Sequence, residues 1–159
     1  MKPMNIQQIK KLALYLMLGL FLIGCQPLET NPPETTLNES STSETQIEEL
    51  SSYTSKDEVA LYIYTFEKLP DNFITKQQAM KLGWDNSKGN LWEVTDQKSI
   101  GGDVFRNFEG LLPKEKGRIY YEADIDYQGG YRNALRIVFS NDGLIFYTND
   151  HYSSFERLY

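Results

Sequence analysis

Residues 118–127 read RIYYEADIDY. Successive side chains of an extended segment point to opposite faces of a sheet. The residues of one face are apolar or aromatic: Ile119, Tyr121, Ala123, Ile125 and Tyr127. The other face is mostly charged and holds Arg118, Tyr120, Glu122, Asp124 and Asp126. This alternation predicts a strand with one face packed on a core and the other face open.

More strands are predicted toward the C-terminus. Gln128-Gly129-Gly130 is a turn signal, and a second strand is expected over residues 132–140 with Arg132 and Arg136 on one face. Asn141-Asp142-Gly143 is typical of a hairpin. Residues 144–148 and 154–158 are expected to form further strands, and residues 100–105 a short edge strand.

The preceding residues predict helices. Ser55 and Glu58 fit a capping box, and apolar residues at helical spacing follow as far as Phe66. A second capping box at Thr75 opens a short helix through Leu82, and residues 90–95 suggest a third. We therefore expect an α+β fold, with N-terminal helices packed on one face of a C-terminal antiparallel sheet of about five strands.

The N-terminal segment resembles an export signal. Three lysines precede the uncharged, mostly apolar run Leu12–Gly24, which has the length of a signal core and is too short for a membrane span. The run ends at Cys25, the only cysteine, in a sequence similar to the bacterial lipobox, so residues 1–25 are expected to be a lipoprotein-type signal. The alternative is an ordinary secretory signal with a chance cysteine. Both alternatives predict export from a bacterial cell. The protein would then be extracellular, or anchored by a lipid to the outer face of the membrane.

Residues 26–50 are rich in Ser, Thr, Pro and Glu and poor in large apolar residues, which is typical of a disordered acidic linker. A pro-segment is the alternative. Residues 51–159 then form one domain with 13 Lys and Arg against 16 Asp and Glu, a net charge of −3. A globally basic nucleic-acid binder is not indicated, so any anion site must be local.

The charged face of the predicted sheet suggests chemistry. A hairpin would bring Glu122 close to Arg132 and Arg136, and His151 is the only histidine of the chain. Arginines match phosphate oxygens, while a carboxylate can accept a proton and an imidazolium can deliver one. These groups suit cleavage of RNA, whose 2′-hydroxyl supplies the nucleophile. The alternative is a structural cross-strand Glu–Arg pair worth at most about 1 kcal/mol.

No cofactor or metal is expected, because one histidine and scattered carboxylates show no ligand spacing.

Nine short stretches carry a family resemblance. In order they are KLPDN (68–72), ITK (74–76), LGW (82–84), SKGNL (87–91), KSIGGD (98–103), EADI (122–125), RN (132–133), RI (136–137) and DHY (150–152). With these, residues 51–159 resemble the barnase-like microbial ribonucleases, the extracellular guanyl-preferring enzymes of bacilli.

The resemblance implies a role for each matching residue. Glu122 would be the general base and His151 the general acid, giving a 2′,3′-cyclic phosphate that is then hydrolysed with the roles exchanged. Lys76, Arg132 and Arg136 match the groups that bind the phosphate. The residues implied in organising the site and binding the base are Asp103, Asn107, Glu109 and Tyr152. Plain structural roles for Lys76, Asp103 and Tyr152 are the alternatives.

Phe108 departs from the family, which has an arginine there that contacts base and inhibitor. We therefore expect a weaker guanine preference and weaker binding of a barstar-like inhibitor. The expected substrate is single-stranded RNA, and the expected assembly is a monomer tethered to a membrane through Cys25. A non-catalytic RNA- or protein-binding module of the same fold and a ribonuclease toxin cargo are the alternatives.

Overall fold

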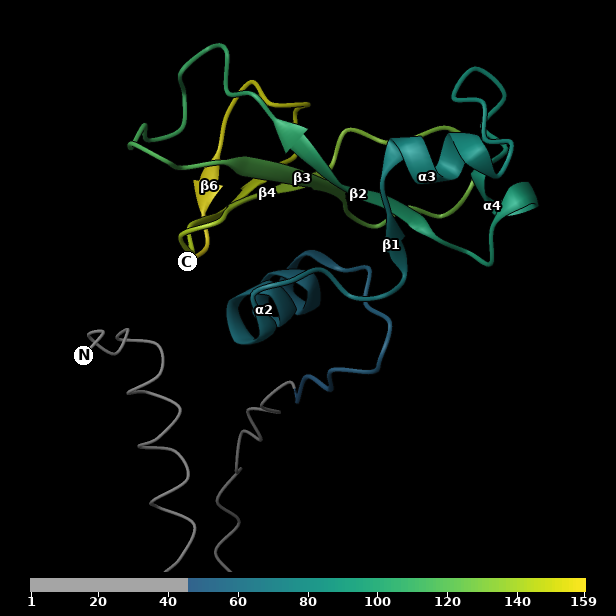
Figure 1. Cartoon of the computed structure of the whole chain (residues 1–159), viewed down its shortest axis with the longest axis horizontal. Helices are drawn as coiled ribbons and strands as arrows, with labels where there is room; N and C mark the ends of the chain where they lie inside the picture. The colour runs from purple at the N-terminus through teal and green to yellow at the C-terminus, as the bar shows by residue number, and fades with distance from the viewer. Residues whose placement is uncertain (1–45) are drawn as a thin grey trace, which may run out of the picture. The chain divides into compact units, whose positions relative to one another are not determined.

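The computed structural model describes residues 46–159 (Figure 1). The predicted signal, its Cys25 and the linker as far as residue 45 lie outside the described residues. The last linker residues contact the domain: the Glu48 amide donates to the Tyr53 hydroxyl, and Glu49 pairs with Lys68 at 2.9 Å. Between residues 46 and 159, no helix combines the length and the apolar character needed to cross a membrane.

Three helices precede most of the sheet. The elements are α2 (Lys56–Phe66), β1 (Phe73–Ile74), α3 (Lys76–Lys81), α4 (Leu91–Val94), β2 (Ser99–Phe105), β3 (Tyr120–Asp124), β4 (Arg136–Ser140), β5 (Ile145–Thr148) and β6 (Glu156–Arg157). The six strands form one sheet in chain order, antiparallel except for the β1–β2 pair. The predicted α+β fold is confirmed, and the two-residue β1 is added to the five expected strands.

The helices begin where their capping residues predict. The Ser55 hydroxyl accepts from the Glu58 amide at the start of α2. At the start of α3, Thr75 and Gln78 form both bonds of a capping box. The second of these caps matters for function, because it fixes Lys76 as the first residue of α3.

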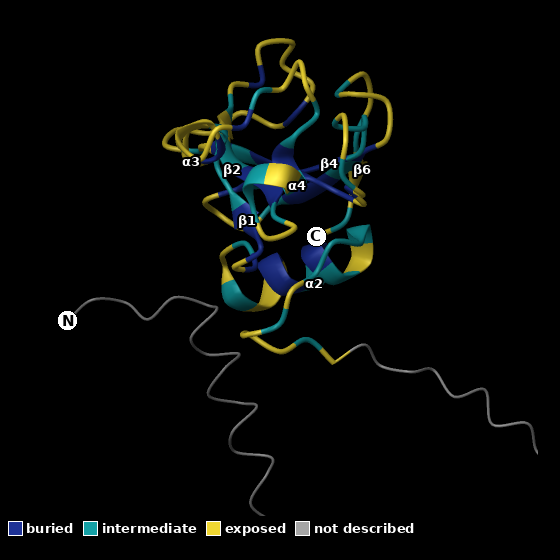
Figure 2. Ribbon diagram, turned by 90° about the vertical axis from the view of Figure 1, so that its right-hand side faces the viewer, coloured by how far each residue is buried: buried dark blue, intermediate teal, exposed yellow. Residues whose placement is uncertain are grey.

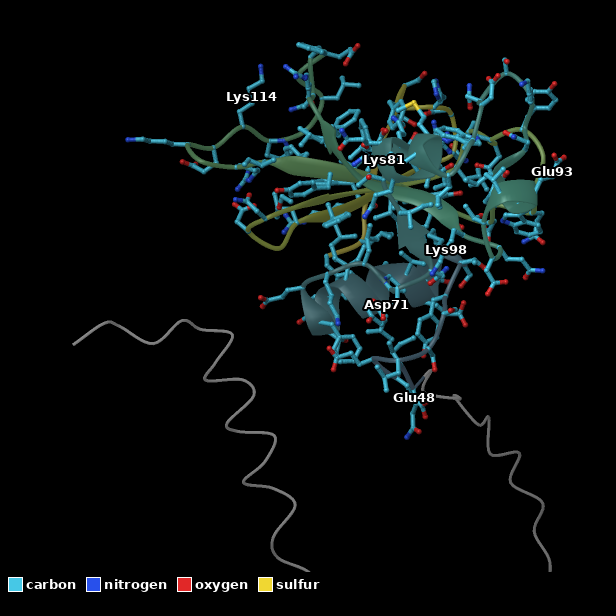
Figure 3. All side chains as sticks on the ribbon, turned by 45° about the vertical axis from the view of Figure 1, so that its right-hand side comes forward. Glu48, Asp71, Lys81, Glu93, Lys98 and Lys114 are labelled. Atoms are coloured by element: carbon cyan, nitrogen blue, oxygen red, sulfur yellow. The ribbon has the colours of Figure 1, made fainter. Side chains whose placement is uncertain are left out.

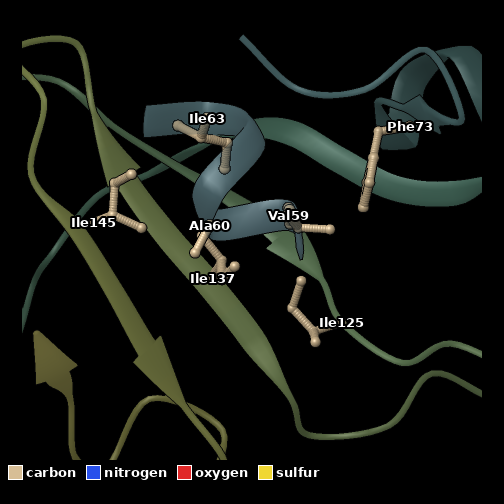
Figure 4. Packing of buried hydrophobic residues seen from close by; sticks show 8 residues of the cluster. Val59, Ala60, Ile63, Phe73, Ile125, Ile137 and Ile145 are labelled. Carbon is tan, nitrogen blue, oxygen red and sulfur yellow. The ribbon is translucent and has the colours of Figure 1, made fainter. Parts of the chain in front are cut away.

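The apolar face of the sheet packs against α2. Val59, Ala60 and Ile63 of the helix meet Ile137 and Ile145 of the sheet in a buried cluster (Figure 4). Figure 2 shows buried residues where α2 meets the sheet and exposed residues along the loops on the opposite side. Since α2 covers one face, the face that bears Glu122 and Asp124 is left for other contacts.

The two central strands are shorter than predicted. Residues 118–127 and 132–140 were each expected to be extended throughout, but β3 ends at Asp124 and β4 begins at Arg136. Asp126 has a positive φ of 51° and its amide donates to the Thr54 carbonyl, which takes the chain out of the sheet. The Asn133 side chain then bonds the Ile125 carbonyl at 2.8 Å, so local bonds replace the expected ladder.

A β-bulge brings a second carboxylate to the Glu122 face. The register between β2 and β3 shifts between Gly101 and Asp103, so that Asp103 stands opposite Glu122. Gly102 is the extra residue and has φ +92°, a conformation that glycine adopts without strain. Directly opposite residues of a sheet share a face, so the bulge sets Asp103 beside Glu122.

The C-terminus of α2 offers a test of the fold. Glu67 caps this helix in a left-handed conformation, and no basic residue lies in the last turn. Both the φ of 58° and the carboxylate near the helix C-terminus are unfavourable. Glu67→Gly is expected to raise the free energy of unfolding by about 1 kcal/mol in urea denaturation. Glu67→Gln removes only the charge and should therefore raise the free energy of unfolding by a smaller amount. An unchanged or lower stability of Glu67→Gly would contradict the assigned conformation.

Candidate active site

Glu122 is a nearly buried carboxylate at the centre of the polar sheet face. It is 6 % exposed and lies in β3. Its Oε1 accepts from the Lys76 ammonium of α3, and its Oε2 accepts from the Tyr152 hydroxyl of the loop after β5. Three segments far apart in the sequence therefore meet at one carboxylate.

Asp124 binds both predicted phosphate-binding arginines. This side chain is 1 % exposed, and Arg132 donates to it from Nε and Nη2, each at 2.6 Å. Arg136 Nε lies 2.9 Å from Asp124 Oδ1, an ion-pair distance, although its N–H is not aligned for a hydrogen bond. The alternative of a structural cross-strand pair between Glu122 and the arginines is therefore wrong, because their ion-pair partner is Asp124.

Sequence reasoning missed the role of Asp124, although the signal was present. Asp124 follows Glu122 by two residues and therefore shares its face. In the sheet register Asp124 stands opposite Arg136, whereas Glu122 stands opposite Val138. The register therefore places Arg136 opposite Asp124, while Arg132 reaches the same carboxylate from the β3–β4 connection.

Opposing effects act on the charge of Glu122. Burial disfavours the carboxylate, but hydrogen bonds from Lys76 and Tyr152, with the charges of Lys76 and Arg132, outweigh it and hold the pKa of Glu122 below its ordinary value. Burial and the bond to Glu122 raise the pKa of the Tyr152 phenol. Glu122 is consequently ionised at neutral pH, and Tyr152 remains a proton donor in their bond.

Asp103 positions Lys76 through the backbone. Its Oδ2 accepts from the Lys76 amide at 2.8 Å, at the N-terminus of α3. The Lys76 side chain reaches past it to Glu122. Asp103 thus fixes the end of the helix from which the lysine extends.

His151 lies on an exposed loop that Asp150 organises. His151 and Tyr152 both have positive φ, 56° and 74°, and their ring centroids are 4.8 Å apart. The Asp150 carboxylate accepts from the Ser154 hydroxyl at 2.6 Å, the Thr148 hydroxyl at 2.7 Å and the Ser153 amide at 3.0 Å. These bonds lower the pKa of Asp150 to about 2. They hold the loop in a conformation that leaves the imidazole in solvent.

His151 and Tyr152 line a groove of about 760 Å³ together with the predicted base-binding residues. Phe108 and Glu109 are exposed in this groove. Asn107 is buried instead. Its side-chain Nδ2 donates to the Leu112 carbonyl at 2.9 Å, and its Oδ1 accepts from the Leu112 backbone amide at 3.1 Å. The Asn107 side chain therefore shapes the loop that carries Phe108 and Glu109.

The structure brings together nearly all the predicted site residues. Tyr152 belongs both to the carboxylate cluster and to the groove, and so connects Glu122 with the His151 side of the site. Among the described residues, no three His, Cys, Asp or Glu side chains are grouped as metal ligands.

The fold and the site define a small α+β domain in which buried carboxylates and basic side chains lie next to a groove that is lined by His151 and Tyr152. Residues 36–159 match the family described as ribonuclease. A ribonuclease of Bacillus intermedius is 51% identical over 79% of this chain and 82% of its own length. A ribonuclease of Heyndrickxia coagulans is 58% identical over 64% of this chain and 94% of its own length. Guanyl-specific ribonuclease St of Saccharopolyspora erythraea is 44% identical over 34% of this chain and 54% of its own length.

The chain therefore belongs to the barnase-like microbial ribonuclease family. This confirms the resemblance found in the sequence, and it makes the chain a ribonuclease that acts on RNA.

The charge balance at Glu122 can be measured directly. Lys76→Met removes a hydrogen bond and a positive charge while burial remains, so the pKa of Glu122 is expected to rise above its ordinary value of about 4.3. Carboxyl ¹³C NMR titration measures this shift. Lys81→Met, in the same helix, is the control and should leave the titration unchanged.

The same variant changes how stability depends on pH. In the wild type the folded pKa of Glu122 is depressed, so its stabilising contribution is present above the unfolded pKa and is lost as the pH falls through the folded value. In Lys76→Met the folded pKa of Glu122 is raised instead, so ionisation of Glu122 lowers the free energy of unfolding as the pH rises. The difference in the free energy of unfolding between wild type and Lys76→Met should therefore grow from about pH 3 to pH 6. An unshifted Glu122 titration in Lys76→Met would contradict this account.

Proposed function

We propose that this ribonuclease is an exported, metal-independent endonuclease that cleaves single-stranded RNA by transesterification to a 2′,3′-cyclic phosphate, followed by hydrolysis. The carrying observation is the contact of Glu122 with Lys76 and Tyr152, beside the arginines held by Asp124 and the groove that contains His151. A proton acceptor, cationic phosphate ligands and a proton donor are thereby available at one site.

In the first step Glu122 acts as the base. Its depressed pKa keeps it ionised in the free enzyme but makes it a weak proton acceptor. A bound phosphate would compete for the Lys76 ammonium and so raise the basicity of Glu122. The carboxylate then takes the proton of the 2′-hydroxyl as this oxygen attacks the phosphorus.

The remaining groups stabilise and complete the reaction. Lys76, Arg132 and Arg136 offset the negative charge that grows on the phosphoryl oxygens. Protonated His151 gives its proton to the departing 5′-oxygen, and the P–O bond breaks to leave the cyclic phosphate. In hydrolysis, neutral His151 takes a proton from the water that attacks the phosphorus, the bond between phosphorus and the 2′-oxygen breaks, and Glu122 returns its proton to that oxygen.

Base recognition is assigned to the groove. Glu109 would accept hydrogen bonds from the edge of the base, and Asn107 shapes the loop that carries Glu109. Asp103 and Tyr152 would order the adjoining part of the site. One relative is named guanyl-specific, which supports guanine as the preferred base. Phe108 offers a ring where the family pattern has a cation, so the preference is weaker and a barstar-like inhibitor binds less tightly.

The location follows from the N-terminal sequence. Residues 1–25 resemble a lipoprotein signal, and Cys25 would carry the lipid that anchors a monomeric enzyme to the outer face of the membrane. The acidic linker would separate this anchor from the catalytic domain.

Cleavage of RNA in EDTA tests the mechanism. The full chain is expected to release products that end in a 2′,3′-cyclic phosphate, and Glu122→Ala and His151→Ala should each lower kcat by about 10²- to 10⁴-fold. Lys81→Ala, at an exposed lysine that contacts neither Glu122 nor the groove, serves as the matched control for preparation and folding.

The same assay distinguishes the alternatives. RNA binding without cleavage would favour a binding module, and activity that survives both substitutions would contradict the assigned acid and base. Dinucleotides that differ only in the base 5′ to the cleaved bond measure specificity, and a Phe108→Arg variant should strengthen the guanine preference. A preference unaffected by this substitution would remove Phe108 from base recognition.

A further inference from the structure

The N-terminal end of the described chain is fastened to the domain. Residues 48–51, here called the docked segment, form a turn in which the Ser51 amide donates to the Glu48 carbonyl at 3.2 Å. The Glu48 amide donates to the Tyr53 hydroxyl at 2.8 Å, and the Glu49 carboxylate lies 2.9 Å from the Lys68 ammonium. Part of the chain whose composition is typical of a linker is therefore bound to the domain.

Tyr62 of α2 depends on the docked segment for the partner of its hydroxyl. The Tyr62 side chain is 0 % exposed, and its hydroxyl donates to the Glu49 carbonyl at 2.7 Å. Within residues 46–159, this is the one hydrogen bond that the Tyr62 hydroxyl makes. A buried hydroxyl without a partner is costly. The docked segment thus completes the polar contacts of α2.

The core holds the residues that receive the docked segment. Tyr53 exchanges two hydrogen bonds with the Asn72 side chain: its amide donates to Oδ1 at 3.3 Å, and its carbonyl accepts from Nδ2 at 2.9 Å. Asn72 is buried, and its carbonyl accepts from the Ser99 amide where β1 meets β2. The Tyr62 ring packs against the Tyr53 ring, with 5.8 Å between the centroids. The docked segment is therefore bound to a surface that the core fixes.

Polar contacts rather than apolar burial hold the docked segment. Its one large apolar side chain, Leu50, is 93 % exposed. The pair of Glu49 with Lys68 is about half exposed, and such surface pairs contribute little. The hydrogen bond from Tyr62 to Glu49 is consequently the main constraint. Since few bonds must break, the segment can open without unfolding of the domain.

The docked segment lies far from the reacting groups. Figure 3 shows Glu48 and Asp71 on the side of the domain that α2 covers, and Lys81, the last residue of α3, on the other side. Lys76 at the start of α3 is the residue that reaches Glu122. A cut in the linker before the docked segment therefore leaves the active site unchanged.

We propose that the docked segment fastens the linker to the catalytic domain and so decides where the enzyme is freed from its anchor. An extracellular endopeptidase adds water across a peptide bond N-terminal to Glu48, and the released enzyme keeps residues 48–51. The biological role rests on the proposed export and anchoring, whereas the docking itself does not depend on RNA cleavage.

Glutamyl endopeptidase, which cuts after glutamate, tests the docking within one chain. Glu44 precedes the docked segment, whereas Glu48 and Glu49 belong to it. A synthetic peptide of residues 41–54 supplies the intrinsic cutting rate at each site. Relative to that peptide, the bonds after Glu48 and Glu49 in the full chain should be cut about tenfold more slowly than the bond after Glu44, because they are cut only when the segment opens. Mass spectrometry identifies the products.

Removal of one hydroxyl provides the decisive variant. Tyr62→Phe should speed cutting after Glu48 and Glu49 about fivefold, the effect of one hydrogen bond, and leave cutting after Glu44 unchanged. Tyr64→Phe is the matched control, because this exposed tyrosine of the same helix makes no hydrogen bond to residues 48–51. Near-UV circular dichroism verifies that both variants are folded.

Two results would overturn the docking. One is an equal relative cutting rate after Glu44 and Glu48 in the wild type, and the other is equal acceleration in Tyr62→Phe and Tyr64→Phe. The product that begins at Thr45 should keep the kcat/KM of the full chain on RNA, and a loss would contradict the proposed place of release. Wild-type protein that cleaves no RNA would refute the proposed function instead, and the cutting rates would still decide the docking.

Discussion

The buried carboxylate of Asp124 is the constraint around which the site is built. A charge that is 1 % exposed is costly unless cations balance it, and removing a partner from such a pair costs several kcal/mol. Arg132 in the β3–β4 connection and Arg136 at the start of β4 meet this requirement. Neutralising Asp124 in the folded protein therefore brings two guanidinium groups to the region of Glu122. The same two cations then lie where the phosphate is proposed to bind.

A second carboxylate, Glu122, connects the sheet with one helix and one loop of the site. Glu122 contacts the helix that carries Lys76 and the loop that carries Tyr152 and His151. Lys76 and Tyr152 are thus held next to the proposed base by direct hydrogen bonds, and His151 follows from its place before Tyr152 in the chain. Three polar side chains accept hydrogen bonds from backbone amides and so fix the segments of the site. Asp103 binds the start of α3, Asn107 binds the loop that carries Phe108 and Glu109, and Asp150 binds the loop that carries His151. The chemistry rests on short loops that buried or multiply bonded polar side chains hold in place.

Much of this arrangement could be predicted from local sequence. The caps at Ser55 and Thr75 and the turn at Asn141-Asp142-Gly143 are local preferences that the structure confirms. The alternation over residues 118–127 predicted a strand, but this strand covers only Tyr120–Asp124, and the face predicted to be open is buried at Tyr120, Glu122 and Asp124. Pairing between distant segments could not be read in this way. The bulge at Gly102 depends on the register of β2 against β3, and the pairing of Arg136 with Asp124 depends on the register of β4 against β3. β3 ends at Asp124, before its predicted end, because the Asp126 amide donates instead to the carbonyl of Thr54, 72 positions away.

The most direct test of the account separates the base from the acid. An RNA dinucleotide whose bridging 5′-oxygen is replaced by sulfur has a leaving group that departs as a thiolate, with an ordinary thiol pKa of about 8.5, and needs no proton. The account predicts that His151→Ala cleaves this substrate within about tenfold of the wild-type rate, whereas Glu122→Ala remains as impaired as on normal RNA. Equal impairment of His151→Ala on the sulfur and oxygen substrates would contradict the assignment of His151 as the proton donor.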